Sequence, residues 1–402
     1  MNKITKFNSF ENLDKIGEIP VYYGFQPIKS PTISKSDEDI AKSIDPENHG
    51  NNSNIINIRT DEKVAIVRMY QEKELFSQSQ PVMLYFKDSI KGAKKNDNFL
   101  GQLEVLGTTS SISEATIIQC ARIMLAEEGY KNTFVEINSI GDKDSLAKFT
   151  RELTSYYRKH INELTTEGRQ LLKKGPFEVL TSDEPSCLEI NKRAPNSINY
   201  LSEGSKKHLE EVLEYLEAIE VPYFINNSLI GNRSLCTETI FTILNADESS
   251  DKNKRSNILA IGGRYSGIAK KMNIKRDVPG CGISILVKAK DKNNKKPLTK
   301  MKKPIASFVQ LSVESKLLSL KVIEILRKAK IPLHLSLSKD RLGAQVSSVE
   351  RYHTPYVIVM GKKEAVENTA IVRHNDSHSQ QIIKIEDLPK YMKDIENKYY
   401  KN

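Results

Sequence analysis

Short apolar runs separated by polar turns dominate the first 286 residues, with one long helical block between them. Seven runs of alternating or continuous apolar residues predict strands. Residues 111–129 carry apolar side chains at helical spacing, and residues 145–220 predict further amphipathic helices. The order of sheet, helices and sheet predicts an α+β unit rather than a regular βαβ alternation. The predicted strands cover residues 54–59, 81–88, 100–107, 133–142, 224–244, 256–272 and 277–286.

The pattern changes after residue 304. Strand-like and helical runs alternate within about 100 residues, which predicts a compact α/β unit with a mixed sheet. Residues 287–303 hold eight lysines in seventeen positions, and such a run predicts an exposed linker. We therefore expect a core at 1–286, a linker at 287–303 and a C-terminal domain at 304–402.

Composition narrows the classes of function. The 402 residues carry a formal net charge of +10, which favours an acidic partner, nucleic acid above all, although a general lysine bias explains the charge equally simply. No apolar run is long enough for a membrane span, and the N-terminus lacks a signal-peptide core. The four cysteines form no CxxC pair, so we expect no metal site and a reducing, cytoplasmic location.

One stretch, NILAIGGRYSGI at 257–268, ends a strand-like run in two glycines, an arginine and a tyrosine. Its extension LAIGGRYSGIAKKM resembles the GGRYDGL strand, turn and helix of histidyl-tRNA synthetases. Other segments resemble motifs of that family in the same order. GFQPIKSPTIS resembles GFxEIxTPxxE, INIRTDEKVAIVR resembles LRPEGTAxxxR, and LEVLG resembles the end of GVExxG. The C-terminal 100 residues resemble its anticodon-binding domain.

The resemblance implies a class II aminoacyl-tRNA synthetase core, an antiparallel sheet flanked by helices, with a helical insertion at about 145–220. It also implies a C-terminal α/β anticodon-binding domain and a homodimer held through the core. An active enzyme of this family would join histidine to tRNA using ATP with Mg, with no cofactor tightly bound. tRNA is then the expected partner, and histidine a possible one.

The positions that would handle ATP depart from the family. Lys87 stands nearest the arginine of the family's FRxE, Lys94 replaces an arginine of the following loop, and Ala289 aligns with the last arginine. Gly231 replaces the arginine of RGLDYY, and Arg233 is displaced by two residues. Guanidinium groups stabilise charge at a reacting phosphate, so we expect weak or absent activation. The candidates that remain are Lys87 and Arg233 for catalysis, and Lys87 and Lys94 for ATP.

Other positions match the family and are candidates for binding histidine. Each of the charged ones has a structural interpretation too. Asp61 also suits a helix N-terminus, and Glu104 also suits a structural salt bridge. For Arg264 an ion pair under the sheet is the favoured interpretation. The candidate histidine-binding residues are Asp61, Glu104, Gly262, Gly263, Arg264 and Tyr265.

Three functions fit these observations. The favoured hypothesis is a synthetase-like protein that binds tRNA with weak or lost histidine activation. The first alternative is an active histidine–tRNA ligase, and the second is a regulatory subunit like that of ATP phosphoribosyltransferase, which lacks a typical anticodon-binding domain. The candidate tRNA-binding residues are Arg341, Arg351, Lys362 and Lys363.

Overall fold

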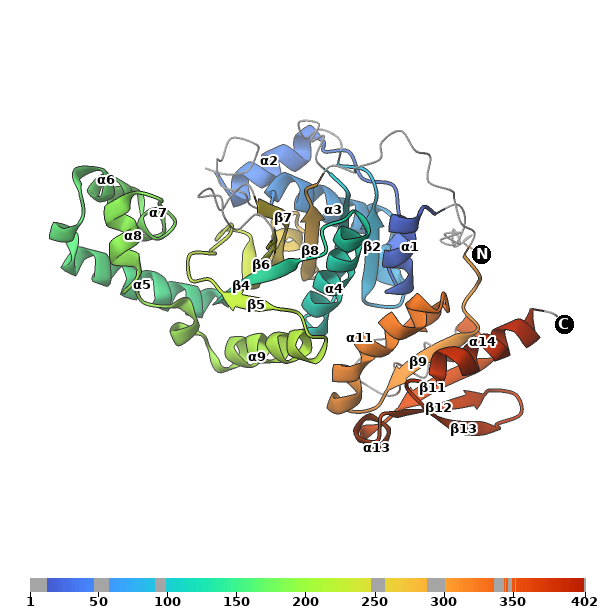
Figure 1. Cartoon of the computed structure of the whole chain (residues 1–402). Coiled ribbons are helices and arrows are strands. Elements are labelled where there is room, and N and C mark those ends of the chain that lie inside the picture. The colour runs from blue at the N-terminus through green and yellow to red at the C-terminus, as the bar shows by residue number, and fades with distance from the viewer. Residues whose placement is uncertain are drawn as a thin grey trace.

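Two sheets organise the chain, as the computed structural model in Figure 1 shows. The larger has eight strands in the order β1-β2-β3-β8-β7-β6-β4-β5, and the smaller has five in the order β10-β9-β11-β12-β13. The structure describes residues 13–46, 58–90, 99–246, 257–287, 301–335 and 352–400, together with four helical residues between 343 and 350.

The eight-stranded sheet is largely antiparallel. Only its two edge strands, β1 and β5, pair in parallel with their neighbours. The central strands β3, β8, β7 and β6 form a continuous antiparallel ladder. The strands are β1 (Gln26–Pro27), β2 (Val82–Phe86), β3 (Gly101–Leu106), β4 (Thr133–Gly141), β5 (Tyr223–Ile225), β6 (Cys236–Asn245), β7 (Ile258–Tyr265) and β8 (Gly280–Ile285).

Helices cover both faces of this sheet because side chains alternate between the faces and both sets are apolar. One face packs on α1 (Lys15–Tyr22), α4 (Ile112–Glu127) and α9 (Glu203–Ala218). The other packs on α2 (Lys35–Ile44), α3 (Thr60–Glu72) and the short α10 (Ile268–Lys271). We call these the α4 face and the α3 face.

The predicted helical insertion extends from the end of β4 and projects away from the C-terminal domain (Figure 1). Its first helix begins where Asp142 accepts hydrogen bonds from the Ser145 amide, 2.8 Å away, and from the Ser145 hydroxyl. The helices are α5 (Lys143–Lys159), α6 (Thr166–Lys174), α7 (Pro176–Leu180) and α8 (Pro185–Asn191), and α9 returns the chain to the sheet.

The C-terminal sheet is mixed, as the alternating pattern predicted. Strands β10, β9 and β11 are parallel, and β12 and β13 are antiparallel. Its elements are β9 (Ala306–Gln310), α11 (Val313–Lys328), β10 (Leu333–Leu335), β11 (Tyr356–Met360), α13 (Lys362–Val366), β12 (Thr369–His374), β13 (Gln380–Lys384) and α14 (Leu388–Tyr399).

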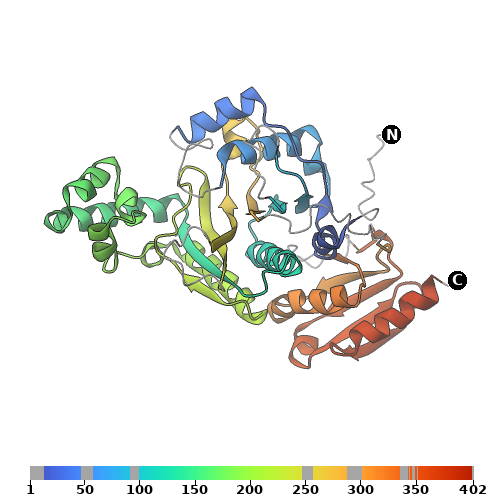
Figure 2. The ribbon, with the colours of Figure 1, turned by 45° about the horizontal axis from the view of Figure 1, so that its top comes forward.

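This domain docks on the core through α11, which packs against α1 and α9 (Figure 2). The Tyr23 hydroxyl donates a hydrogen bond to Glu324 at 3.1 Å, and Arg327 neutralises the same carboxylate. One apolar cluster runs continuously from the α4 face into the C-terminal sheet. The two units therefore share part of their hydrophobic core.

The predicted fold class is confirmed, with a helix-flanked antiparallel core and a separate C-terminal sheet domain. Three of the predicted strands are corrected in part. The run at 224–244 forms two strands, β5 and β6, and the run at 256–272 ends in the short helix α10. Ile58 and Arg59 lead directly into α3 and form no strand, while residues 54–57 lie outside the described residues. Most of the lysine-rich segment, 288–300, also lies outside them, so the domain boundary stays a prediction. No helix among the described residues is long and apolar enough to cross a membrane.

The shared core generates a stability prediction. Leu320 in α11 is completely buried in the cluster that joins the two units. Leu320→Ala should lower the free energy of unfolding by about 2–5 kcal/mol, because a cavity remains where the side chain was. Leu188→Ala, on the half-exposed side chain of α8, should cost less than about 1 kcal/mol. Chemical denaturation measures both, and equal losses would contradict the shared core.

Candidate functional site

A buried ion pair occupies the middle of the α3 face. Lys63 of α3 inserts its ammonium beside the Glu104 carboxylate of β3, and their side chains are 2% and 0% exposed. Gln102 donates a second hydrogen bond to Glu104 at 2.8 Å, and the Tyr265 hydroxyl donates a third at 2.8 Å. The Lys63 ammonium also lies 5.2 Å from the centre of the Tyr265 ring. The Glu104 carboxylate is thus surrounded by donors from its own chain.

The glycines beside this pair leave space that is filled by other side chains of the same chain. Gly282 is the cross-strand partner of Glu104, and any Cβ there would overlap the Glu104 carboxylate. Gly280 is covered in the same way by the ring of Tyr265. Burial and the adjacent Glu104 charge raise the pKa of the Tyr265 hydroxyl well above its usual value, so it stays a hydrogen-bond donor. Small residues here serve to admit Glu104 and Tyr265.

The second predicted carboxylate is neutralised as well. Asp61 lies in the first turn of α3, where it accepts a hydrogen bond from the Arg59 Nε at 3.0 Å and a second, shorter one from the same guanidinium. The amide of Glu62 adds a third at 2.9 Å. The charge of Asp61 is therefore balanced by Arg59, although Asp61 lies close to Lys63 in sequence.

Arg264 lies on the opposite, α4 face, where it pairs with Glu114 of α4. Its Nε and Nη2 donate to Glu114 at 2.8 and 2.6 Å, Nη1 donates to the carbonyl of Thr108, and Nη2 also donates to the carbonyl of Ser110. Burial alone would raise the pKa of Glu114, but the Arg264 charge and the hydrogen bond from His208 lower it to about 2. This arrangement is the ion pair under the sheet that the sequence favoured.

The four residues of GGRY therefore divide between the two faces. Gly262 faces the helices of the α4 side, where a Cβ would overlap the Phe241 ring, and Arg264 follows it there. Gly263 and Tyr265 face α3, and the space above Gly263 is bounded by Ile58. Of the six candidate histidine-binding residues, the structure brings Glu104, Tyr265 and Gly263 to one face of the sheet.

Sequence comparisons match the same architecture to known proteins. Residues 307–395 match the family model described as the anticodon binding domain. The chain is 25% identical over 340 residues to the histidine–tRNA ligase of Listeria monocytogenes serotype 4b, covering 82% of this chain and 79% of that one. It is 24% identical over 404 residues to the histidine–tRNA ligase of Macrococcus caseolyticus, covering 94% of both. The chain is thus similar to histidyl-tRNA synthetases over nearly its whole length. Among solved structures, apo S. aureus histidyl-tRNA synthetase matches with 19% identity and a TM-score of 0.48, over 94% of this chain and 93% of that one.

Two of the four residues that the resemblance associates with ATP can be placed in the structure. Lys87 follows β2 and pairs with Asp14 at 2.6 Å. Arg233 stacks on the ring of Phe177 in the insertion, 4.5 Å from its centre, and lies 3.8 Å from Glu178. Lys94 and Ala289 lie outside the described residues. No group of three or more metal-ligating side chains occurs within the described ranges.

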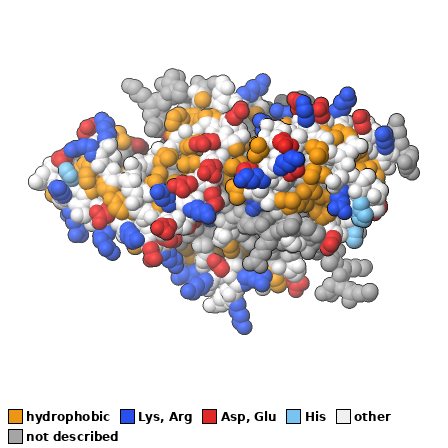
Figure 3. Space-filling model, turned by 90° about the horizontal axis from the view of Figure 1, so that it is seen from below, with side chains coloured by type: hydrophobic (Ala, Val, Ile, Leu, Met, Phe, Trp, Pro, Cys, Tyr) orange, Lys and Arg blue, Asp and Glu red, His pale blue; other side chains and the backbone are white. Residues whose placement is uncertain are grey.

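Two of the four candidate tRNA-binding residues can be placed. Lys362 begins α13 and pairs with Glu314 of α11 at 3.3 Å, whereas the neighbouring Lys363 is exposed. Arg341 and Arg351 lie outside the described residues. The face drawn in Figure 3 carries acidic and basic side chains mixed together rather than a single block of one sign.

Sequence reasoning missed Lys63, the residue that closes this site. A lysine in an amphipathic helix usually lies on the solvent side. The available signal was the family motif, because Lys63 stands where LRPEGTA has threonine. Its partner Glu104 is 41 positions away, so local pattern alone could not have joined the two.

The Glu114 pair generates a prediction about acid stability. The pKa of Glu114 is about 2 in the folded chain and ordinarily about 4.5, so its stabilising contribution is complete above pH 4.5 and is lost as pH falls towards 2. Wild type should exceed Glu114→Gln in unfolding free energy at pH 6. That gap should narrow by roughly 2 kcal/mol at pH 3. Denaturant titrations at both pH values measure it, and a constant gap would contradict the assignment.

Proposed function

We propose that this chain is a histidyl-tRNA synthetase-like protein that binds tRNA and has weak or lost histidine activation. The observation that carries the proposal is the Lys63–Glu104 ion pair. An amino-acid ligand presents an ammonium group, and a buried carboxylate is the natural partner for it. Here an ammonium of the chain itself already holds that place.

Histidine would have to displace Lys63 to use Glu104. Removing one partner from a buried ion pair typically costs 3–5 kcal/mol, since the other charge is left buried and unpaired. A free-energy difference of about 1.4 kcal/mol changes a dissociation constant tenfold. That penalty therefore weakens histidine binding by roughly a hundredfold to several thousandfold. Gly282 and Gly280 offer no compensating room, because Glu104 and Tyr265 fill it.

The residues expected to contact the phosphates of ATP support the same proposal. Activation needs ATP, with Mg, held where charge develops at the α-phosphate, and arginine forks are the usual groups for that task. Lys87 is engaged by Asp14, and Arg233 is engaged by Phe177 and Glu178. Losing one preorganised charge contact costs about 10²–10³ in rate. In this proposal, ATP with Mg is a ligand only of an active enzyme.

tRNA binding is assigned to the C-terminal domain. The match to an anticodon binding domain and the net positive charge support it. We further propose a homodimer through the core, supported by the resemblance of GFQPIKSPTIS, which contains β1, to the family's dimer segment.

An active histidine–tRNA ligase is the second candidate, favoured by sequence similarity to such ligases over nearly the whole chain. It requires Lys63 to leave Glu104 during binding. A regulatory subunit like that of ATP phosphoribosyltransferase ranks third, because the anticodon binding match speaks against it.

The first prediction concerns amino-acid binding and activation. The purified chain should show weak or no histidine-dependent exchange between ATP and pyrophosphate. Lys63→Thr should bind free histidine at least tenfold more tightly than wild type by calorimetry, because it frees the Glu104 carboxylate. The double variant Lys63→Met/Glu104→Gln removes both charges and should bind no better than wild type. Robust exchange by wild type would return the active ligase to the lead.

The second prediction concerns tRNA. Binding to the whole chain should weaken steeply as salt rises, because lysine and arginine release counterions from phosphates. Arg341→Ala, Arg351→Ala and Lys363→Ala should each lower the salt slope by about one. Lys390→Ala, on the exposed side of α14 in the same domain, is the matched control and should leave the slope unchanged. Equal slopes for all four variants would reject this surface.

A further inference from the structure

Strand β5 leaves one edge of the eight-stranded sheet open. Among the described strands it pairs with β4 alone, and it lies at the outer end of the sheet (Figure 1). The Val135 amide of β4 donates a hydrogen bond to the carbonyl of Pro222 at 2.9 Å. Alternate residues of a strand direct their backbone groups to opposite sides. The backbone groups of Tyr223 and Ile225 therefore point away from β4, where a further strand can pair with them.

Two large apolar side chains are exposed on this edge. Phe224 is 60% exposed and Ile225 is 51% exposed. Because side chains alternate along a strand, the two lie on opposite faces of the sheet. Phe224 rests edge-on against Phe134 of β4, with ring centres 5.3 Å apart. Soluble proteins usually mask an apolar sheet edge, so exposed residues on both faces of this one point to a surface that another chain covers.

Carboxylates flank the edge on both faces. Glu136 of β4 is the cross-strand partner of Phe224. Glu217 near the end of α9 accepts a hydrogen bond from the Tyr223 hydroxyl at 2.8 Å, and the exposed Glu220 lies between α9 and β5. No lysine or arginine in the described ranges forms an ion pair with any of these three carboxylates. The edge is therefore acidic, in a chain whose formal net charge is +10.

The charge of this edge decides which kind of partner fits it. Nucleic acids and anionic membranes carry negative charge, so the carboxylates repel them. A second copy of this chain would bring the same carboxylates into contact, since a two-fold interface pairs identical surfaces. A segment rich in lysine or arginine can instead lay its side-chain stems along Phe224 and Ile225 and extend its cations to Glu136 and Glu217.

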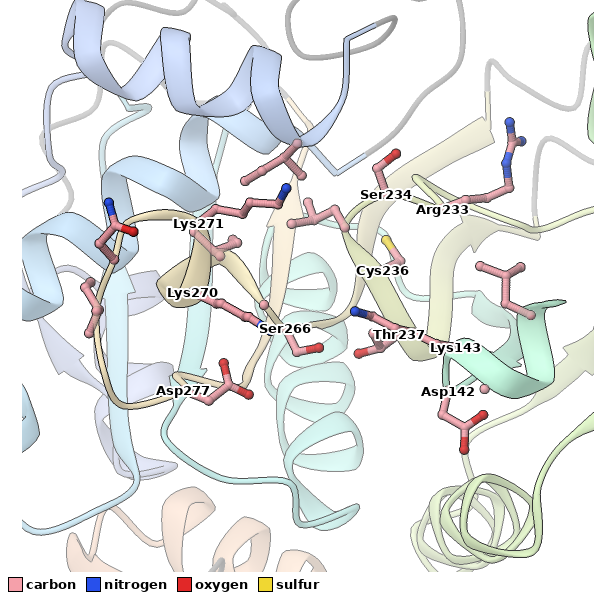
Figure 4. Close-up of a pocket in the computed structure, with 18 of the residues that line it drawn as sticks. Asp142, Lys143, Arg233, Ser234, Cys236, Thr237, Ser266, Lys270, Lys271 and Asp277 are labelled. Atoms are coloured by element: carbon pink, nitrogen blue, oxygen red, sulfur yellow. The ribbon is translucent and has the colours of Figure 1, made fainter.

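The edge is separate from the basic cavity at the ends of β6 and β7. That cavity encloses about 720 Å³ and is lined by Arg233 and four lysines against two aspartates (Figure 4). No residue of β5 lines it. The β5 edge therefore presents a surface of the opposite charge to that cavity.

We propose that the β5 edge docks an extended, basic segment of a partner protein, which adds a strand to the sheet. The backbone of the segment pairs with Tyr223 and Ile225, and its lysine or arginine side chains meet Glu136 and Glu217. Backbone pairing supplies affinity, and the carboxylates select for positive charge. The edge is distinct from the candidate histidine site and from the C-terminal domain, so this proposal stands or fails independently of histidine and tRNA binding.

Fluorescence anisotropy with the whole chain tests the proposal, with a labelled seven-residue peptide of alternating lysine and valine as the probe. This peptide should bind, and a matched peptide of alternating glutamate and valine should bind weaker by roughly tenfold or more. A peptide of alternating lysine and proline keeps the charge but loses backbone donors, so it should also bind weaker by roughly tenfold or more. Hydrogen exchange at the amides of Tyr223 and Ile225 should slow when the lysine–valine peptide binds.

Variants locate the binding on the chain. Phe224→Ser removes apolar contact and Glu217→Gln removes a charge, so each should weaken binding of the lysine–valine peptide by roughly fivefold to tenfold. Leu188→Ser replaces an exposed apolar side chain of α8, and Glu203→Gln lies at the opposite end of α9. These two are the matched controls and should leave binding unchanged. Thermal unfolding midpoints close to that of wild type verify that the four variants are folded.

Several results would overturn the proposal. The lysine–valine peptide might fail to bind, or a control peptide might bind equally well, which would remove the role of charge or of backbone pairing. Wild-type affinity in Phe224→Ser would place the peptide elsewhere. Self-association that Phe224→Ser abolishes would assign the edge to a second copy of the chain. Binding of single-stranded RNA that Phe224→Ser weakens would assign it to nucleic acid.

Discussion

The core is organised around one buried charge pair, the ammonium of Lys63 against the carboxylate of Glu104. The pair joins a helix that covers the sheet to a strand at its centre. Removal of either residue alone lowers the stability of the fold, because an isolated buried charge costs several kcal/mol. The pair also constrains its neighbours. Gly282 must be small to leave room for the Glu104 carboxylate, and Tyr265 must keep its hydroxyl proton to donate a hydrogen bond to that carboxylate. The α3 face of the sheet is closed as a result.

The α4 face is closed by a similar device. Arg264 and Glu114 form a second buried pair, with His208 and Thr239 completing the hydrogen bonds of the carboxylate. Both pairs involve the central strands β3 and β7 of the sheet.

The strands, the helical insertion and the mixed C-terminal sheet could be predicted because each depends on local apolar periodicity. The period of two along β7 even implies that Gly262 and Arg264 face away from Gly263 and Tyr265. The chemistry of the site could not be predicted in this way. It depends on Lys63 meeting Glu104 across 41 residues, and a lysine in a helix carries no local signal of burial. Arg233 was displaced by only two positions in sequence, yet its contact with Phe177 draws it into the insertion.

Covalent connection gives the Lys63 ammonium an advantage over a free ligand in the contact with Glu104. A free amino acid must surrender translational and rotational freedom to place its ammonium beside a carboxylate. Lys63 has no such freedom to lose, because folding of α3 places its ammonium beside Glu104. Its effective concentration there is far above that of a free metabolite. A ligand must then overcome both the ion pair and this advantage. One lysine in the first turns of α3 can therefore act as a permanent internal partner of the Glu104 carboxylate.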